Sequence, residues 1–251
     1  MRKQRYLTLE KRLSVPLWTK LAVPLASIVA GFLFSAIFLL ISGESSIEVY
    51  SVMFEGAFGS AYGLSETVVK MIPLMIISVG VAFAFKMQIW NAGGEGQLHI
   101  GAAAATYVVL HLNGCSRFVT VLLAFLAAFI CAGIYGLIPA ILKVKWKVNE
   151  LITCLMLNYV ATFFVSWLIQ GPWKDPTGFA FPRTRKIPSA GELTTFFGTR
   201  IHTGLIIGLA IALALWFVIY KTRWGFEIKL IGAKEKVARY AGMSVNRNIL
   251  L

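Results

Sequence analysis

The long apolar runs of this chain constrain its fold more than any other feature. Six runs approach or exceed the roughly 17 to 25 residues that a helix needs to cross a bilayer. They cover residues 21–41, 68–85, 97–112, 118–142, 151–169 and 203–220. Their residues do not alternate between polar and apolar, as the strands of a membrane barrel would. The chain is 58% hydrophobic and only 14% charged, which is unusual for a soluble domain. We therefore expect an all-α, polytopic transmembrane helix bundle with about six spans.

Two of these runs need a separate interpretation. The run 97–112 is short, contains His99 and follows a glycine-rich segment. It is expected either to cross the membrane at a tilt or to form a discontinuous helix that enters partway. The run 21–41 is too long for a signal peptide and no small-residue cleavage site follows it cleanly, so we interpret it as a retained anchor.

The distribution of charged residues predicts the orientation in the membrane. A net charge of +13 would also suit a nucleic-acid-binding protein, but segment 42–66 contains four Glu and no Lys or Arg. Cytoplasmic loops are enriched in Lys and Arg, so we place the N-terminus in the cytoplasm and this acidic segment outside. The basic residues that would then share the cytoplasmic face are Arg2, Lys3, Arg5, Lys11, Arg12, Lys20, Lys143, Lys145, Lys147, Lys221, Arg223, Lys229, Lys234, Lys236 and Arg239.

This orientation predicts the organisation of the chain. Residues 1–20 form a basic cytoplasmic N-terminus, and residues 21–251 form the transmembrane domain with a cytoplasmic segment at about 221–245. Residues 170–202 are then extracellular, although they contain five Lys and Arg residues. Four prolines in this loop predict irregular or extended backbone.

The segment 91–97, Asn-Ala-Gly-Gly-Glu-Gly-Gln, interrupts the apolar sequence between the second and third runs. Polar groups at membrane depth persist where they line a cavity, cap a broken helix or face a protein interior. Each glycine disfavours a helix by roughly 1 kcal/mol relative to alanine. We therefore expect non-helical backbone over 91–97, beside a translocation path, whose freed backbone groups either bind a polar solute or are satisfied by neighbouring spans. Glu95 is expected to be protonated or to cap a neighbouring broken helix.

A second polar cluster opens the fifth run. Asn149 is expected to cap a helix N-terminus, and Glu150 complements the positive end of the helix dipole. A place for both in the substrate path remains an alternative. Asn158 lies in mid-span beside Tyr159, where its amide needs a partner. It either joins neighbouring helices, which is the commoner use of such residues, or contacts the substrate.

The segment after the sixth run mixes small and charged residues. Gly232 and Gly242 bracket about nine good helix formers, and Ala238 and Ala241 lie between them. A short helix of this composition either docks into a groove of a cytosolic partner or lies at the membrane interface.

The sequence contains no recognisable catalytic or metal-binding motif. Cys115, Cys131 and Cys154 are widely spaced, match no Cys/His ligand pattern, and are interpreted as small apolar residues. The sequence has no Gly-x-x-x-x-Gly-Lys-Ser/Thr loop and no signature of an intramembrane protease. We expect a protein that is not an enzyme, that uses no cofactor or metal, and that obtains any ATP-derived energy through a partner.

Three separated motifs together suggest a family. They are the segment 91–97 with 100–102, the segment 149–153 running into 156–159, and Gly225 followed by 231–232 and 238–242. In this order they resemble the permease family of bacterial ABC importers for simple sugars and nucleosides, most closely its nucleoside branch. The resemblance covers the chain from about residue 60 to its end.

The resemblance implies both partners and residue roles. The chain would be a permease in the bacterial cell membrane that pairs with a second permease and two cytoplasmic ABC ATPase subunits. An extracellular substrate-binding lipoprotein would deliver a nucleoside or sugar. The substrate path would include Asn91, Glu95, Gln97, Asn149, Glu150 and Asn158. A helix that couples to the ATPase would include Gly232, Ala238, Arg239, Tyr240, Ala241 and Gly242. Family members usually continue for several more spans, so we expect this sequence to be the N-terminal portion of the fold.

Two other functions are also compatible with the sequence. A secondary transporter or channel would use Glu95 as an ion- or proton-coupling site, and a membrane scaffold would transport nothing. A neighbouring gene for an ATPase with a Walker motif would favour the importer over both.

The predicted orientation can be tested with single cysteines in a background that lacks the three native ones. Cysteines at Ser46 and Thr177 should react with an impermeant thiol reagent on intact cells, because both segments are expected outside. A cysteine at Lys234 should react only after the membrane is opened. Labelling of position 234 but not of position 46 on intact cells would reverse the orientation.

Overall fold

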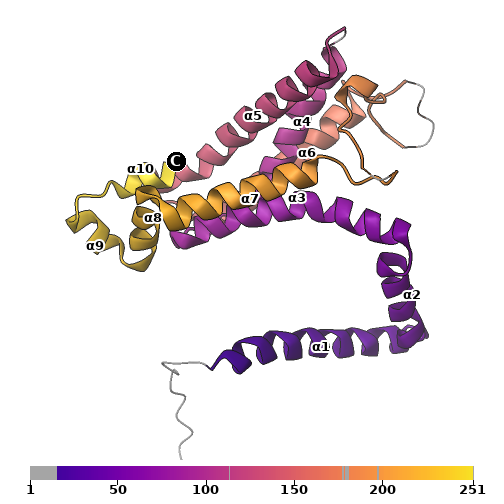
Figure 1. Ribbon diagram of the computed structural model, residues 1–251, viewed down its shortest axis with the longest axis horizontal. Coiled ribbons are helices and arrows are strands. Elements are labelled where there is room, and N and C mark those ends of the chain that lie inside the picture. The colour runs from indigo at the N-terminus through magenta and orange to yellow at the C-terminus, as the bar shows by residue number, and fades with distance from the viewer. Residues whose placement is uncertain (1–15, 113, 177, 179–180, 197, 251) are drawn as a thin grey trace, which may run out of the picture. The chain divides into compact units, whose positions relative to one another are not determined.

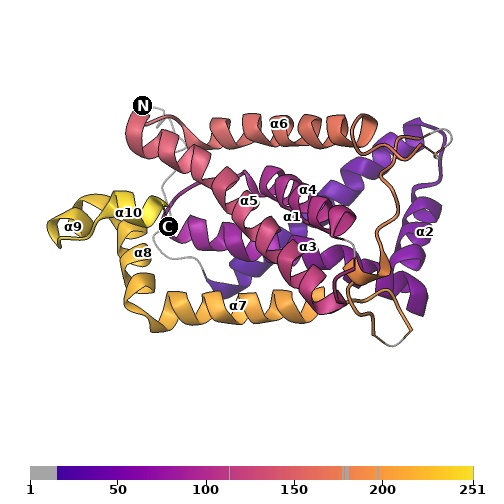
Figure 2. The ribbon, with the colours of Figure 1, turned by 90° about the horizontal axis from the view of Figure 1, so that it is seen from above.

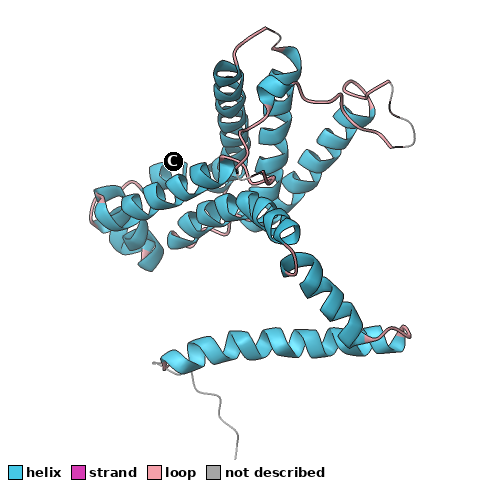
Figure 3. Ribbon diagram, turned by 45° about the vertical axis from the view of Figure 1, so that its right-hand side comes forward, coloured by secondary structure: helices cyan, strands magenta, loops and turns pink. Residues whose placement is uncertain are grey.

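The computed structural model describes residues 16–112, 114–176, 178, 181–196 and 198–250, and over these ranges it is helical (Figure 1, Figure 3). The α-helices are α1 (Leu17–Ile41), α2 (Ser46–Phe58), α3 (Ala61–Lys86), α4 (Gly94–His111), α5 (Arg117–Trp146), α6 (Glu150–Gln170), α7 (Gly204–Lys221), α8 (Arg223–Ala233), α9 (Glu235–Tyr240) and α10 (Val245–Leu250). Extended pairing among these residues is limited to two isolated bridges. The predicted all-α class is confirmed. The basic residues at positions 2–12 lie outside the described ranges.

Each of the six apolar runs forms a helix, but only five of these helices are long and apolar enough to cross a membrane. They are α1, α3, α5, α6 and α7. The predicted run 97–112 corresponds to α4, which is not among them. Its first turns contain Glu95, Gln97 and His99, so its mean hydropathy is lower than that of the other five. The expected number of about six spans is therefore corrected to five such helices within the described residues.

The chain divides into two compact units, residues 1–64 and residues 65–251. In the first unit α2 folds back on α1. The Tyr50 hydroxyl donates to the Phe32 carbonyl (2.7 Å), the Ser46 hydroxyl donates to the Ala36 carbonyl (2.9 Å), and the Tyr50 and Phe32 rings meet edge to face. Most apolar side chains of α1 are exposed, as is expected of a helix that faces lipid.

In the second unit α4 packs against α5 and α6 (Figure 2). Small residues allow this close approach. A Cβ added to Gly101 would lie 3.4 Å from the Ala128 carbonyl oxygen and 3.4 Å from the Ala132 methyl group of α5. Ala103 and Val109 of α4 are buried. The face of α4 that carries Gly101, Ala103 and Val109 is therefore buried in this unit, whereas Glu95 and Tyr107 lie on its exposed face.

Glycines also set the position of α7 against α3. A Cβ on Gly208 would lie 2.6 Å from Met75 Cε, and one on Gly204 would lie 3.5 Å from Ile72 Cγ2. α8 then begins directly after α7, because the Thr222 side chain accepts a hydrogen bond from the Gly225 amide (3.2 Å). Gly225 packs on the last backbone carbonyls of α7. This sharp turn requires a residue without a Cβ at position 225.

The short helix expected between Gly232 and Gly242 is α9. α8 continues through Gly232 to Ala233, the backbone of Lys234 is extended (φ −157°, ψ 101°), and α9 starts at Glu235. α9 ends before Gly242, whose φ of +78° is the left-handed conformation that favours glycine. Gly232 is thus an interior helix residue, whereas Gly242 terminates a helix as the sequence suggested.

The proline-containing loop 170–202 is irregular, as predicted, within its described residues. It contains one short 3₁₀ helix, Ser189–Gly191, and two isolated bridges. Arg117 Nε and Nη2 both donate to the Glu192 carbonyl (2.8 and 2.6 Å), and Arg200 pairs with Glu66 (3.1 Å). Arg117 therefore holds the loop against α5, and Arg200 holds it against α3.

Candidate functional site

A break in the helical backbone separates α3 from α4. α3 ends at Lys86, Gln88 has a positive φ of 60°, and α4 starts at Gly94. The prediction of non-helical backbone is confirmed for residues 91–93 and is wrong for residues 94–97. Those four residues form the first turn of α4, because the Gln97 amide donates to the Gly93 carbonyl (3.0 Å).

Asn158 of α6 holds this break. Its Oδ1 accepts a hydrogen bond from the Gly96 amide (2.9 Å), and its Nδ2 donates to the Ala92 carbonyl (2.9 Å). The first amides of a helix have no partner within the helix, and Asn158 supplies one from a neighbouring helix. The side chain is only 9% exposed. Of the two roles considered for Asn158, this geometry favours the joining of helices over contact with a substrate.

We call Asn158 and its two backbone partners, Gly96 and Ala92, the clamp. Gly96 packs closely within it. A Cβ at this position would lie 2.8 Å from Asn158 Oδ1 and 3.2 Å from Tyr135 Cε1. The Tyr135 hydroxyl in turn donates to the Leu157 carbonyl (2.6 Å). Tyr135 was not predicted as a site residue, since nothing in the sequence distinguishes it from other aromatic residues of a span.

Asn91 shapes the other end of the break. Its Oδ1 accepts from the Gly93 amide (3.0 Å) in a local turn that asparagine commonly forms. The buried Cys154 thiol lies 3.7 Å from the same oxygen and donates to it. Cys154, interpreted from sequence as a small apolar residue, is therefore also a hydrogen-bond partner of the break.

A cavity of about 540 Å³ lies beside the break. Helices α3, α4, α5, α6, α7 and α10 contribute to its wall, which is mostly apolar. The polar residues that line it are Asn91, Gln97, Lys143, Glu150, Cys154 and Asn248. The cavity thus brings together three of the six residues predicted for the substrate path.

Gln97 extends from the first turn of α4 toward α5. The wall opposite it contains a glycine, Gly136. A Cβ at this position would lie 2.9 Å from Nε2 of the Gln97 side chain. Gly136 therefore leaves the space that the Gln97 side chain occupies. A larger residue at position 136 would displace the amide from the cavity wall.

Lys143 and Glu150 form an ion pair on the cavity wall. The pair joins the end of α5 to the start of α6, and both side chains are mostly buried. The sequence indicated Lys143 only as a marker of orientation, and Glu150 as a partner of the helix dipole or a residue of the substrate path. Asn149 is the predicted helix cap, because its Oδ1 accepts from the Leu151 amide (2.9 Å) and the Ile152 amide (3.4 Å). It is exposed and does not line the cavity.

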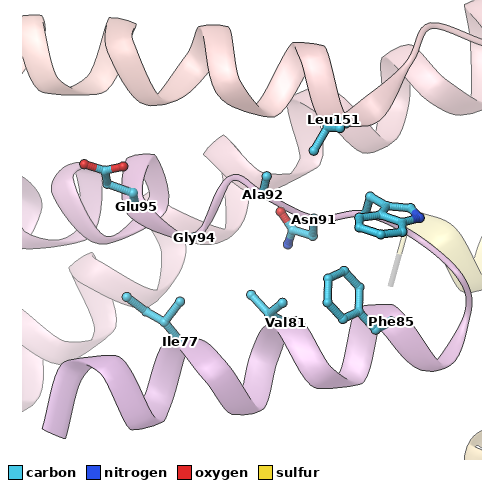
Figure 4. Close-up of a pocket in the computed structure, with 9 residues that line it drawn as sticks. Ile77, Val81, Phe85, Asn91, Ala92, Gly94, Glu95 and Leu151 are labelled. Carbon is cyan, nitrogen blue, oxygen red and sulfur yellow. The ribbon is translucent and has the colours of Figure 1, made fainter. Parts of the chain in front are cut away.

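Glu95 lies apart from the large cavity. It lines a smaller pocket of about 230 Å³, together with Asn91 and the apolar side chains Ile77, Val81 and Phe85 of α3 (Figure 4). Its carboxylate is exposed and lies 4.0 Å from His99 Nε2 on the next turn of α4. The start of α4 favours a negative charge, so Glu95 stands at the N-terminus of its own helix rather than capping a neighbouring one.

The six residues predicted for ATPase coupling divide into two groups. Gly232 packs on the Lys86 carbonyl at the end of α3, and Ala238 is fully buried with Ile231 and Val245. The other four are exposed, namely Arg239, Tyr240, Ala241 and Gly242. Arg239 pairs with Glu235 (2.7 Å), and Tyr240 is 95% exposed. Within the described residues no group of three or more His, Cys, Asp or Glu side chains is arranged to hold a metal.

Comparison with known proteins gives consistent similarities. Residues 63–251 match the family model described as branched-chain amino acid transport system / permease component. The chain is 35% identical to the guanosine ABC transporter permease protein NupP of Bacillus subtilis, over 92% of this chain and 66% of that relative. It is 33% identical to the glucose ABC transporter permease protein TsgB13 of Haloferax volcanii, over 95% of this chain and 65% of that relative. It is 32% identical to the nucleoside ABC transporter permease protein NupB of Lactococcus lactis, over 92% and 66%. The chain therefore spans slightly less than two thirds of these relatives, and no solved structure is significantly similar to it.

The clamp predicts a stability effect for Asn158→Leu. The substitution leaves the Gly96 amide and the Ala92 carbonyl without their partner, and each unsatisfied buried group costs about 1–3 kcal/mol. We expect a lower Tm of the detergent-solubilised protein. Asn246→Leu, at an exposed position of α10, is the matched control and should leave the Tm unchanged. Equal Tm values for Asn158→Leu and the wild type would show that the break does not depend on these two hydrogen bonds.

Proposed function

This chain belongs to the branched-chain amino acid transport system / permease component family, and on that premise we propose that it forms a membrane subunit of an ATP-driven importer for nucleosides or simple sugars. The observation that carries the proposal is the cavity of about 540 Å³ between the helices, with amide side chains and the Lys143–Glu150 ion pair on a mostly apolar wall. Small-molecule sites commonly occupy about 300–1,000 Å³ and combine apolar walls with a few polar groups. Relatives named for guanosine, nucleoside and glucose transport support this class of substrate.

The chemistry of the cavity suits a neutral, hydroxyl-rich solute. The amides of Asn91 and Gln97 provide both donors and acceptors, and Phe83 and Phe129 provide apolar faces. The Lys143–Glu150 pair presents no net charge to the cavity. A nucleoside or sugar needs no counter-charge, so the two amides are the groups that we expect to bind its hydroxyls or base edge.

Energy for transport would come from separate subunits. The sequence contains no nucleotide-binding loop, so we propose that two cytoplasmic ABC ATPase subunits bind the segment α8–α9. Its exposed face, formed by Arg239, Tyr240, Ala241 and Gly242, is the proposed contact. Closure of the ATPases on ATP would shift this segment and expose the cavity alternately to the two sides of the membrane. A second permease subunit and an extracellular binding lipoprotein complete the proposed importer, with the N-terminus in the cytoplasm.

The substrate role of Gln97 predicts a transport defect for Gln97→Leu. Leucine has a similar volume but cannot form a hydrogen bond, and an unpaired polar group of the substrate costs about 1–3 kcal/mol, or roughly fivefold or more in uptake. Uptake of radiolabelled nucleoside should fall by that factor while expression and ATPase association remain normal. Gln170→Leu, at the exposed end of α6, is the matched control and should transport normally.

The same assay also separates the importer from the alternatives. Normal uptake by Gln97→Leu would remove Gln97 from the substrate path. Uptake that is abolished by a protonophore but unaffected by depletion of ATP would replace the importer with a secondary transporter.

The exposed face of α8–α9 predicts a coupling defect for Ala241→Trp. A bulky side chain there should overpack the contact with the ATPase without disturbing the fold of the permease, since position 241 is exposed. We expect less ATPase to copurify with this variant than with Ala30→Trp, a control on the exposed surface of α1. Unchanged copurification together with unchanged ATP-driven uptake would place the ATPase contact elsewhere.

A further inference from the structure

One side chain of α8 contacts two walls of the cavity without lining it. The Trp224 indole Nε1 donates to Asn248 Oδ1 of α10 (2.8 Å), and its ring packs against Phe83 of α3 with a centroid separation of 5.4 Å. Phe83 and Asn248 both line the cavity of about 540 Å³, and so do Ile249 and Leu250 beyond Asn248. Trp224 therefore connects the segment that follows α7 to both α3 and α10.

Asn248 forms hydrogen bonds through both the oxygen and the nitrogen of its side-chain amide. It is only 3% exposed, and its Nδ2 donates to Glu227 Oε2 of α8 (2.9 Å) and to the Ser244 carbonyl (3.2 Å). α8 thus holds Asn248 with two side chains, Trp224 and Glu227, one as donor and one as acceptor. A buried amide whose donors and acceptor are all hydrogen-bonded is compatible with a stable fold, whereas a buried amide that loses a partner raises the free energy of the folded state. Any displacement of α8 must therefore move Asn248 with it or break these hydrogen bonds.

The rest of α8 makes the segment suitable for transmitting a displacement. Gly225 fixes its start against the end of α7, and Gly232 packs on the backbone at the end of α3. Ile231 of α8, Ala238 of α9 and Val245 of α10 form one buried cluster. This cluster also packs against Ile249 of the cavity wall, so α9 is joined to the cavity through packed side chains of the kind that can carry coupling between two sites.

We propose that Trp224 is the positioning residue through which the segment α8–α9 controls the cavity, acting on Asn248 and Phe83. This proposal rests on the proposed importer function, because it assumes that a partner moves α8–α9. When α8 shifts, Trp224 draws Asn248 and the following residues Ile249 and Leu250 along the cavity wall. The cavity then changes its opening without any contact between Trp224 and the substrate.

The test uses Trp224→Phe in the assembled permease–ATPase complex. Phenylalanine retains the ring contact with Phe83 and removes the N–H that Asn248 accepts. We expect ATPase copurification and the rate of ATP hydrolysis to stay within about twofold of wild type, while the number of nucleosides imported per ATP falls about fivefold or more, the factor that corresponds to one net hydrogen bond. The matched control is Trp216→Phe on α7, a residue that is 53% exposed, and it should leave that ratio unchanged.

A double-mutant cycle with Asn248→Leu identifies the interaction itself. If Trp224 acts through Asn248, the double variant should import no fewer nucleosides per ATP than Asn248→Leu alone, because both substitutions remove the same hydrogen bond. Additive defects would overturn the proposal. So would an unchanged ratio in Trp224→Phe, or a loss of transport that only parallels a loss of assembled complex, since a purely structural role predicts the latter.

A second readout does not depend on the substrate. A cysteine at Ala140, on the cavity wall, is introduced in the background without native cysteines, and its rate of reaction with a maleimide is compared with and without ATP and vanadate. We expect trapping to change the rate about fivefold or more in the otherwise wild-type complex and to have little effect in Trp224→Phe. The same response in both would overturn the proposal. Absence of nucleoside and sugar uptake by the wild type, with this cysteine response intact, would overturn the proposed substrate and leave the role of Trp224 supported.

Discussion

The structure of the larger unit depends on the two hydrogen bonds between Asn158 and the backbone of the break. A chain that interrupts a helix among apolar spans exposes amides and carbonyls that water cannot reach, and each unsatisfied group is costly. Asn158 accepts from Gly96 and donates to Ala92, so it satisfies one group on each side of the start of α4. This fixes where α4 begins and how it is joined to α6. The neighbouring amide of Asn91 and the thiol of Cys154 complete the same small network.

The position of α4 determines what the cavity contains. Because α4 packs against α5 and α6 through small residues such as Gly96 and Gly101, one face of its first turn is buried in the unit, whereas Glu95 on the other face is exposed. Gln97 is thereby directed to the cavity, where Gly136 leaves room for it. The Lys143–Glu150 pair closes the loop between α5 and α6 on the same wall. A mostly apolar cavity that holds a few polar side chains thus follows from where α4 starts and how closely it packs.

The segment after α7 contains residues that pack within the chain and residues that are exposed for an external contact, and the sequence did not distinguish the two groups. Small residues there were expected to admit a partner, yet Gly232 admits the backbone of α3 and Ala238 fills the internal cluster with Ile231. The exposed Tyr240 and Ala241 remain for an external contact. Small size alone does not tell whether a residue allows close approach within the chain or between chains. Only the direction of the side chain decides this.

The sequence by itself determined the helical class, the location of the five long apolar helices and some of the helix ends. These features depend on neighbours within a few residues: apolar runs long enough to span, the cap at Asn149 and the prolines of loop 170–202. The tertiary structure alone decided that α4 packs against α5 and α6, that α8 includes Gly232, and that Asn158 bonds the break. It also brought in Asn248 and Tyr135, which the sequence did not distinguish. The reason is physical: a hydrogen bond between residues 62 apart in the sequence, such as that of Gly96 and Asn158, depends on how helices pack, and the residues next to each partner in the sequence do not specify which distant residue it will meet.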